Sequence, residues 1–432
     1  MYLLYIREPI FGPTGAARLP RQIPRCTWMP HQAEVHHRMI RGRLSDAHDD
    51  LQRISSAETV YEPLHLPPIT RRPSPTALYL PHAGTATRPF IVFDCLAALR
   101  PKSHSMPASS KPVALVVGAS RGIGRQVAVD LARNGYAVVV AAKSVSDPGV
   151  PLPSPPPAPN SAESTITTVA HEINDAGGDA TAIPVDVRHE RSVNELVQKT
   201  LSTYGRLDVL VYNSGAIFWA PVHDTPLKRF QLMQRVNPEG LYAVVQAALP
   251  HLRDAAARGG APKSTSTAAG RIVVVSPPIY SRFFRGKTAY AMGKVAMSVL
   301  TKGLAMDFAR RGDDALGMAI TSLWPAVAIE SAATAPMTAA NPDERNDLRK
   351  ATIFSDAVLA ILAAPPSVVN GELLLDEDFL RAHAAITDFS KYNVVPGTTP
   401  RRIMPARLPD LTVAEQDDEG KRYVSAAAKS RL

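Results

Sequence analysis

The chain has 432 residues, 39 of them proline, and a formal net charge of +9 at pH 7. Its two cysteines, Cys26 and Cys95, exclude a disulfide framework and a cysteine-based metal site, and we expect no bound metal. No apolar run approaches the roughly 18 residues of a membrane span, so no transmembrane helix is expected. Because lysine and arginine are scattered along the chain, the charge does not favour nucleic-acid binding.

Residues 1–105 are rich in proline and arginine and show little sustained hydrophobic periodicity. Such a composition rarely orders by itself, and it predicts a disordered extension. An organelle transit segment is the alternative, since the first 45 residues hold many arginines and few acids. We place the folded domain at residues 106–381.

A strand–turn–helix–strand unit opens this domain. The apolar, mostly β-branched run at 113–117 predicts a buried strand, and a second such run follows at 137–142. Between them lies a turn with Gly118, Gly122 and Gly124, followed by a helical pattern. Such a turn brings backbone N–H groups and the positive helix N-terminus close to a pyrophosphate. A tight turn without a ligand is the alternative.

The same alternation of strand and helix continues to the end of the domain. After a proline-rich loop at 146–160 it predicts helices at 165–176, 190–204, 225–250 and 354–364, and strands at 180–187, 207–213, 271–276, 316–324 and 372–375. Residues 253–270 are expected to be a flexible loop, and 327–352 a substrate-covering loop with a short helix. The pattern predicts a single α/β domain with a doubly wound parallel sheet of seven strands.

The chemistry is predicted at Tyr290 and Lys294. On a helix, residues four apart share a face, so the lysine ammonium would lie beside the tyrosine phenol. We expect the cation to lower the tyrosine pKa towards neutrality, where a general acid works best. A Tyr-x3-Lys spacing alone is common by chance, and its position after the fifth strand is what gives it weight.

The residues near the end of the second strand indicate which dinucleotide would bind. Lys143 follows that strand where an acidic residue would select NAD, and Arg121 adds a second positive group within the glycine turn. Two basic groups and no acid favour a 2′-phosphate, and therefore NADP(H). The alternative is that Lys143 is merely solvated.

These motifs resemble the short-chain dehydrogenase/reductase family, which has a Rossmann fold. The resemblance covers roughly residues 112–400 and rests on the Gly-x3-Gly-Ile-Gly turn, on Asn213 and Gly215, on Asn237-x-x-Gly240 and on the Tyr290/Lys294 pair. It implies a catalytic role for Tyr290, Lys294 and Asn237. It also implies cofactor contacts from Gly118, Ser120, Arg121, Gly122, Ile123, Gly124, Lys143, Asp186, Asn213, Gly215, Tyr290, Lys294 and Pro325.

The resemblance implies an NADP(H)-dependent oxidoreductase acting on CH–OH groups of a small, lipid-derived carbonyl or alcohol. Several positions depart from the family: Pro277 replaces the usual serine, and Tyr212 and Ala326 replace Asn and Gly. Ser276 is one residue out of register, and Ser281 lies in an uncertain loop. The alternative is therefore an NADP(H)-binding regulatory or partner module with little or no turnover.

Residues 382–432 lose periodicity and are predicted to form a tail with a targeting signal. The chain ends in Ser430-Arg431-Leu432, which resembles the Ser-Lys-Leu address bound by the peroxisomal import receptor. A family subgroup with Pro-Pro after the fifth strand, as at 277–278, is largely peroxisomal. We expect a peroxisomal protein, with mitochondrion or cytoplasm as alternatives. Since the family commonly pairs, a homo-oligomer is left open.

Overall fold

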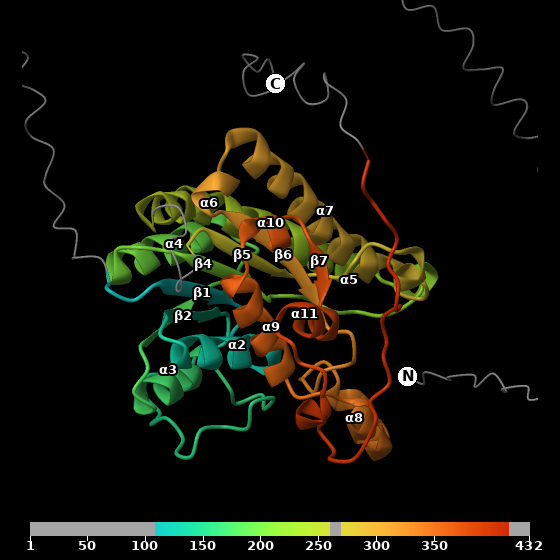
Figure 1. Cartoon of the computed structure of the whole chain (residues 1–432). Coiled ribbons are helices and arrows are strands. Elements are labelled where there is room, and N and C mark those ends of the chain that lie inside the picture. Colours follow the sequence, from blue (N-terminus) through green and yellow to red (C-terminus); the bar gives the residue numbers. More distant parts are fainter. Residues whose placement is uncertain (1–108, 260–268, 414–432) are drawn as a thin grey trace, which may run out of the picture. The chain divides into compact units, whose positions relative to one another are not determined.

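Seven parallel strands form one sheet in the order β3-β2-β1-β4-β5-β6-β7 (Figure 1). The structure is a computed structural model that describes residues 109–259 and 269–413. The strands are β1 (Val113–Val117), β2 (Ala137–Ala142), β3 (Ala180–Pro184), β4 (Val209–Tyr212), β5 (Arg271–Val275), β6 (Ala319–Trp324) and β7 (Leu373–Leu375). The predicted doubly wound parallel sheet is confirmed. The predicted extension at 1–105 and the terminal Ser430–Leu432 lie outside the described residues.

Helices cover both faces of the sheet (Figure 1). In that view α4 (Glu190–Tyr204), α6 (Gly240–Gly259) and α7 (Thr288–Arg311) lie above the strands, and α2 (Gly122–Arg133), α3 (Ile166–Asp175) and α9 (Thr352–Ala363) lie below. The remaining helices are α5 (Leu227–Gln234), α8 (Ala335–Ala340), α10 (Pro366–Val369) and α11 (Asp376–His383).

The strands are apolar along their whole length because both faces of the sheet are buried. Successive side chains of a strand point to opposite faces. Accordingly Val116 and Val138 join the core under α2 and α9, whereas Leu115 and Val139 join the core under α4 and α6. A parallel sheet with two covered faces therefore explains the continuous apolar runs in the sequence.

The long helix predicted at 225–250 is interrupted. Between α5 and α6 the backbone forms one π-helical segment, Arg235–Glu239, which contains Pro238. Proline has no N–H to donate to the preceding turn, and a local π segment accommodates that loss. The helix after this interruption, α6, continues to Gly259 and so enters the region that was predicted to be a flexible loop.

The chain after residue 381, predicted to be the start of the tail, packs against the domain. Phe389, Tyr392 and Met404 are buried there. Burial of apolar side chains stabilises a segment even where its sequence shows no periodicity. Each of these side chains packs against a distant part of the chain, so no regular spacing between them is needed. The packed part of the chain thus extends about 20 residues beyond the predicted domain end.

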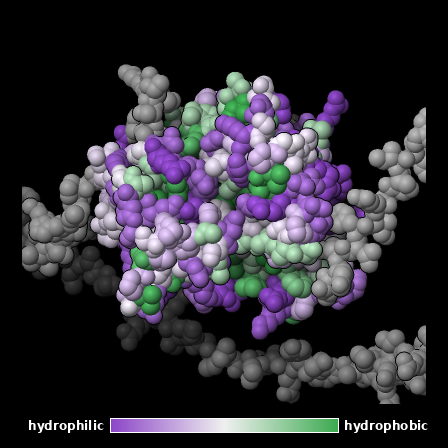
Figure 2. Space-filling model, turned by 90° about the horizontal axis from the view of Figure 1, so that it is seen from below, coloured by the Kyte–Doolittle hydropathy of each residue, from purple (hydrophilic) through white to green (hydrophobic). Residues whose placement is uncertain are grey.

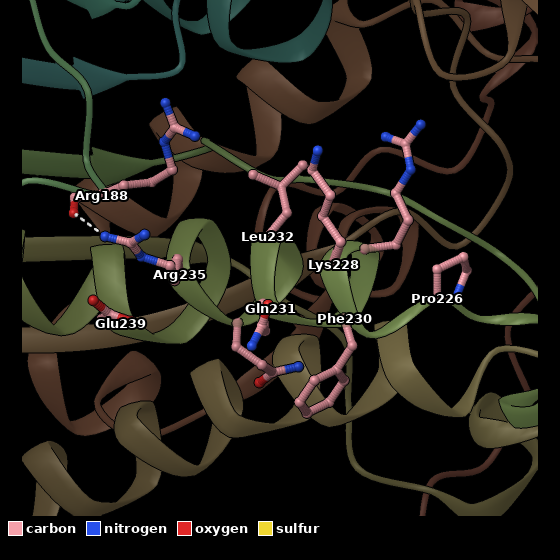
Figure 3. A pocket seen from close by; sticks show the side chains of 10 residues that line it. Arg188, Pro226, Lys228, Phe230, Gln231, Leu232, Arg235 and Glu239 are labelled. Carbon is pink, nitrogen blue, oxygen red and sulfur yellow. Dashed lines mark hydrogen bonds between the residues drawn. The ribbon is translucent and has the colours of Figure 1, made fainter.

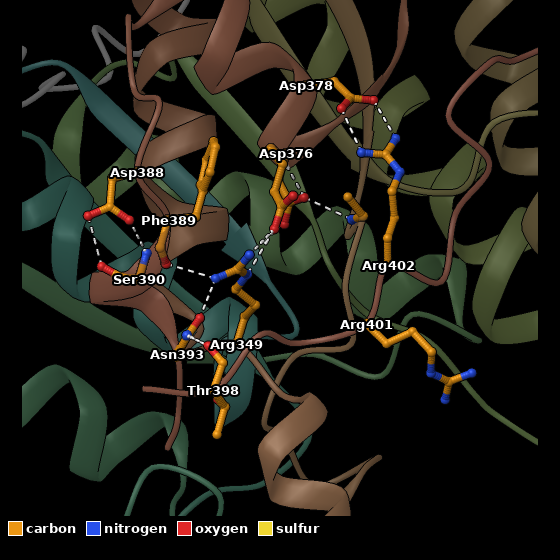
Figure 4. A network of polar contacts seen from close by, with 12 residues as sticks. Arg349, Asp376, Asp378, Asp388, Phe389, Ser390, Asn393, Thr398, Arg401 and Arg402 are labelled. Carbon is orange, nitrogen blue, oxygen red and sulfur yellow. Dashed lines mark hydrogen bonds and ion pairs between the residues drawn. The ribbon is translucent and has the colours of Figure 1, made fainter. Parts of the chain in front are cut away.

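Ion pairs fix the same segment (Figure 4). The Arg349 guanidinium lies 2.6 Å from the Glu377 carboxylate, and it also donates to the carbonyl oxygen of Phe389. Arg402 makes two parallel hydrogen bonds to Asp378, of 2.7 and 2.6 Å. Paired N–H groups of arginine match the two oxygens of a carboxylate, so these contacts also orient the chain.

Hydrophobic side chains on the face shown in Figure 2 form small, separated patches among hydrophilic ones. This distribution fits a domain whose main apolar surfaces are already covered by its own helices. Within residues 109–259 and 269–413, no helix combines the length and the apolar character needed to cross a membrane.

Candidate active site

Three glycines form the turn between β1 and α2: side chains would not fit at Gly118 and Gly124, and Gly122 has a positive φ of +58°. Gly118 has φ +91°, and a Cβ on Gly124 would lie 2.2 Å from the Gly118 carbonyl oxygen. That oxygen accepts a hydrogen bond of 2.9 Å from the Asn213 side chain, which follows β4. The turn, the helix and β4 are therefore packed directly against one another.

The N-terminus of α2 is suited to an anion. Its first turn holds no acidic residue, and no side chain caps it within the described residues. The Gly122 N–H donates to the Pro159 carbonyl oxygen of the proline-rich loop, at 3.1 Å, whereas the N–H groups of Ile123 and Gly124 have no acceptor in the described chain. Such N–H groups at a positive helix end fit the pyrophosphate of a dinucleotide.

A buried serine between the proline-rich loop and α3 also contacts the glycine turn. The Ser164 hydroxyl donates to the Ser120 carbonyl oxygen at 2.6 Å. This contact joins residues 44 positions apart, and no local signal in the sequence identifies it. The chain between β2 and α3 is therefore bonded to the glycine turn at two points, Pro159 and Ser164.

Basic groups gather around Asp186, two residues after β3. Lys143 Nζ lies 3.4 Å from the Asp186 carboxylate, and the Arg188 guanidinium makes two hydrogen bonds to it. These bonds, chiefly those from Arg188, hold the pKa of Asp186 well below its usual range. The sequence analysis missed Arg188, although its place two residues after Asp186 is a usable signal. The Asp186 carboxylate is therefore paired with two basic side chains, those of Lys143 and Arg188.

Tyr290 and Lys294 both lie on α7 and are 2% and 4% exposed. The Lys294 ammonium donates to the Val275 carbonyl oxygen at the end of β5, at 2.8 Å. It also lies 5.4 Å from the ring centroid of Trp324. The lysine is therefore fixed between two strand ends and the helix that carries the tyrosine.

The expected lowering of the Tyr290 pKa is not found in this structure. Burial raises the pKa of the Tyr290 phenol above its usual value, and burial lowers the pKa of Lys294 to about 7. The physical reason is that desolvation disfavours the charged form of each group, while the lysine amine is turned to the Val275 carbonyl. In this state the phenol keeps its proton.

Asn237 is buried in the π-helical segment. Its Oδ1 accepts from the Ala216 N–H at 2.7 Å, and its Nδ2 donates to the Ala216 carbonyl oxygen at 3.1 Å. A Cβ built on Gly215 would lie 3.6 Å from the Asn237 Oδ1 and 3.4 Å from the Lys294 Nζ. The loop after β4, the π segment and α7 therefore bring these two side chains to the same glycine.

Pro325 follows β6 in a turn that is held by the residue after β7, the parallel neighbour of β6. The N–H of Ala326 donates to the buried Asp376 carboxylate at 2.8 Å. Burial raises the pKa of Asp376 to about 7. Asp376 therefore fixes the backbone beside Pro325, a role that its position in the sequence did not reveal.

The sequence model of the short chain dehydrogenase family matches residues 112–150 and 159–335. The chain belongs to this family. Its members use a nicotinamide cofactor, NAD or NADP, and interconvert carbonyls and alcohols. The unmatched residues 151–158 fall within the proline-rich loop.

Relatives with the same name recur among curated proteins. Hydroxysteroid dehydrogenase-like protein 2 of Danio rerio is 36% identical over 72% of this chain and 66% of its own length. The Mus musculus protein is 33% identical over 70% of this chain and 54% of its own length. The chain thus spans about half to two thirds of these relatives. The resemblance to this group that the paired prolines indicated is confirmed.

Two solved structures cover the same region. A candidate dehydrogenase from Xanthomonas campestris is 34% identical, with a TM-score of 0.55, covering 72% of this chain and 100% of its own. A short chain dehydrogenase from Mycobacterium thermoresistibile is 32% identical, with a TM-score of 0.55, covering 67% of this chain and 93% of its own. Both agree with the fold of the described domain.

The family serine is absent at its expected register. The Ser276 hydroxyl lies 2.6 Å from the Ser322 hydroxyl, and both side chains are fully buried between β5 and β6. Pro277 offers only its carbonyl oxygen, which accepts from Ser298 at 2.6 Å. Ser281 is exposed and begins a 3-10 segment, Ser281–Phe284. Ser276 is therefore engaged elsewhere, as its strand register predicted.

An aromatic cluster surrounds Tyr290. Trp219 packs edge-on at 6.0 Å between ring centroids, and Phe283 lies at 6.3 Å. Phe283 in turn meets Trp324 at 5.9 Å. Trp219 is 47% exposed, so this wall is open to solvent on one side. We call Phe218, Trp219, Phe230, Tyr280, Phe283, Phe284, Tyr290 and Trp324 the aromatic cluster.

A pocket of about 970 Å³ lies along α5 (Figure 3). Its basic lining residues are Arg188, Lys228, Arg229 and Arg235, and Glu239 is its one acid. Arg235 donates to the Arg188 carbonyl oxygen at 3.3 Å, which joins the π-helical segment after α5 to the segment after β3. None of the lining residues was predicted as a site residue. The pocket therefore adds a basic surface next to Asp186.

No metal site was expected from the sequence. In the part of the chain that the structure describes, no group of three His, Cys, Asp or Glu side chains could hold a metal ion.

Proposed function

We propose that the protein is an NADP(H)-dependent oxidoreductase that interconverts a carbonyl and an alcohol. The observation that carries this proposal is that the side chains of Asn237 and Lys294 both approach Gly215. Lys294 lies one helical turn after Tyr290 on α7. The α2 turn, with two N–H groups that lack an acceptor in the described chain, supplies a place for the dinucleotide.

Each residue has a distinct role in this reaction. When bound, the nicotinamide supplies or accepts the hydride. The protonated Tyr290 phenol gives its proton to the carbonyl oxygen during reduction and takes it back during oxidation. Lys294 supplies N–H donors beside it, and Asn237 holds the backbone of Ala216. The proton path thus runs along groups that are already fixed by packing.

The contacts to the dinucleotide are assigned to the turn and the strand ends. The amides of Ile123 and Gly124, with Ser120 and the Gly118–Gly122 turn, would hold the pyrophosphate. Asp186 lies beside the adenine in this proposal, and Asn213 and Gly215 hold the turn after β4. Pro325 would contact the nicotinamide carboxamide.

A preference for NADP(H) over NAD(H) is supported by charge. Arg121 has no acidic partner in the described chain, and Lys143 is 72% exposed on its side chain although it approaches Asp186. Together with Arg188 these bases outnumber the one acid at the adenosine end. An additional phosphate would be stabilised by this excess of positive charge.

The substrate proposal is a lipid-derived carbonyl or alcohol. Its support is the aromatic cluster, which offers an apolar wall beside Tyr290, and the names of the relatives, which refer to hydroxysteroids. Apolar lining with few polar groups is typical of sites for small hydrophobic ligands.

A peroxisomal location and recognition by the import receptor remain part of this proposal, supported by Ser430-Arg431-Leu432 alone. A fluorescent fusion that leaves Leu432 as the last residue should enter peroxisomes. Deletion of these three residues should abolish that import. A fusion that stays in the cytosol, or one whose import survives the deletion, would contradict the assignment.

A homo-oligomer formed through α6 and α7 is also proposed. Met292, Val299 and Met306 follow one another at intervals of seven on α7 and are exposed, and Tyr242 on α6 is exposed too. Large apolar side chains on one helix face favour a covered surface. Sedimentation of the full chain, compared with Val299→Glu, would test whether this face joins subunits.

The alternative is a cofactor-binding module with little turnover, which Pro277 favours because the family hydroxyl is missing. NADPH consumption by the full chain over ketosteroids, 3-ketoacyl thioesters and aldehydes separates the two. Turnover that is lost in Tyr290→Phe establishes the reductase. Binding of NADPH without turnover on any of these carbonyls favours the module.

A further inference from the structure

A lysine amine is built into the aromatic cluster beside Tyr290. The Lys287 Nζ lies 4.2 Å from the ring centroid of Phe283 and 5.3 Å from that of Trp219. Both rings pack against the Tyr290 ring. The ammonium is therefore held within the wall that surrounds the reacting phenol, three residues before it on the chain.

The contacts of this ammonium are incomplete. Aromatic faces attract a cation, but they do not accept three N–H hydrogen bonds as water does. Neither a hydrogen bond nor an ion pair of Lys287 Nζ is found among the described residues. Lys287 is half-buried, and burial lowers its pKa. A partly desolvated ammonium without an acceptor is costly, and a bound anion would remove that cost.

The charge of the surrounding cluster has one sign. Arg229 lies 5.5 Å from the Phe218 ring centroid, and Lys294 lies over Trp324. Like Lys287, neither has a carboxylate partner in the part of the chain that the structure describes. Arg282 and Arg285, on the segment before α7, are exposed and also basic. An apolar wall with uncompensated cations suits a ligand that is apolar along its length and negatively charged at one end.

We propose that the substrate carries a carboxylate, which Lys287 binds while the carbonyl of the substrate lies at Tyr290. This proposal rests on the proposed oxidoreductase function and narrows its substrate class to oxo or hydroxy acids. Lys287 is then a specificity-determining residue, because it contacts the substrate away from the reacting atoms. Lys287 is the N-cap residue of α7 and Tyr290 lies in its first turn, so the protein sets the distance between the bound carboxylate and the reacting carbonyl.

The first test compares keto acids with their neutral esters, using the full chain and NADPH. The substrates are 4-oxopentanoate, 6-oxoheptanoate and 8-oxononanoate, each beside its methyl ester, since the carbonyl-to-carboxylate distance is the unknown. For at least one acid, kcat/KM should exceed that of its ester by about ten- to one-hundred-fold, the usual range for a hydrogen bond to a charged group.

The variants assign this preference to one residue. Lys287→Met should remove the preference, so that kcat/KM for the acid falls to about that of its ester. Lys287→Arg should restore part of it, because the charge returns. Arg285→Met, which removes a nearby exposed charge, should behave as the unaltered protein. Equal losses on acid and ester in Lys287→Met would mean that Lys287 only packs, and would overturn the proposal.

A binding measurement keeps the two proposals separable. Octanoate and methyl octanoate are titrated by calorimetry into the full chain and into Lys287→Met. The Kd of octanoate should rise about tenfold or more in the variant, with no change for the ester. If no ketone is reduced but octanoate binding depends on Lys287, the reductase proposal fails and the anion site stands. If ketones are reduced without preference for the acids, the anion site fails.

Discussion

The hydroxyl of Tyr212, at the end of β4, donates a hydrogen bond of 2.6 Å to the carbonyl oxygen of Val236. Val236 lies in the π-helical segment immediately before Asn237. A Cβ on Gly240 would lie 2.6 Å from the same hydroxyl, so the glycine makes room for it. The tyrosine that departs from the family pattern therefore holds the segment that positions Asn237.

Tyr212→Phe tests this relationship. The substitution leaves the partly buried Val236 carbonyl without its donor, which costs about 1–3 kcal/mol. We expect a lower free energy of unfolding and a kcat reduced about tenfold, because Asn237 loses its support. Tyr204→Phe is the matched control, since its buried hydroxyl bonds to Thr181 and Asp179 on β3 and the turn before it. A control that slows turnover as much as Tyr212→Phe would contradict the assignment.

The cofactor preference is tested by removing charge. In the double variant Arg121→Ser, Lys143→Asp, the affinity for NADPH relative to NADH should fall about tenfold to one-hundredfold, the value of one or two charge-assisted contacts. Fluorescence titration of both cofactors measures it. Arg133→Ser, at the far end of α2, should change neither affinity. Tighter binding of NADH than NADPH by the unaltered protein would show that the proposed preference is wrong.

The fold could be predicted because its signals are local. Each strand is a short apolar run, and the turns that lead from a helix into the next strand carry a glycine, as at Gly135 or Gly205. Tyr290 and Lys294 were predicted from their spacing on a helix after the fifth strand, whereas Asn237 came from the resemblance to the family's Asn-x-x-Gly. What remained hidden depends on single contacts between distant residues.

The region after residue 381 shows this limit. Phe389, Tyr392 and Met404 are separated by polar residues at irregular spacing, so no period marks them as buried. Their partners, including Arg349, lie about 40 or more residues away along the chain. Similarly, the pKa of Tyr290 was predicted in the wrong direction because spacing places Lys294 nearby but does not show that its amine turns to Val275.

Arg349→Met tests how strongly the segment after α11 is held. Its partner Glu377 would remain buried without a counter-charge, which costs about 3–5 kcal/mol of the free energy of unfolding. Urea denaturation of the full chain measures this loss. Arg402→Met is the control, because its partner Asp378 is 47% exposed and such a pair contributes about 0–1 kcal/mol. If both substitutions lowered the free energy of unfolding equally, the burial of Glu377 could not be the reason for the loss in Arg349→Met.

The buried carboxyl of Asp376 predicts a pH dependence of stability. Its pKa is raised from 3.8 to about 7 by burial, so between these values the folded state binds a proton that the unfolded state has lost. This group therefore stabilises the fold most below about pH 4, and its contribution is lost as the pH rises towards 7, by at most about 1.4 kcal/mol per pH unit.

Asp376→Asn removes this titration while keeping an oxygen that accepts from the Ala326 and Glu377 N–H groups. Between pH 5 and pH 7, the unaltered protein should lose stability relative to the variant, and above pH 7 the difference should become constant. Denaturation by urea at four pH values measures both curves. Glu372→Gln, an exposed position four residues earlier, should follow the unaltered protein. Parallel curves for Asp376→Asn and the unaltered protein would mean that Asp376 does not titrate in this range, and that its carboxylate holds Ala326 in the charged form.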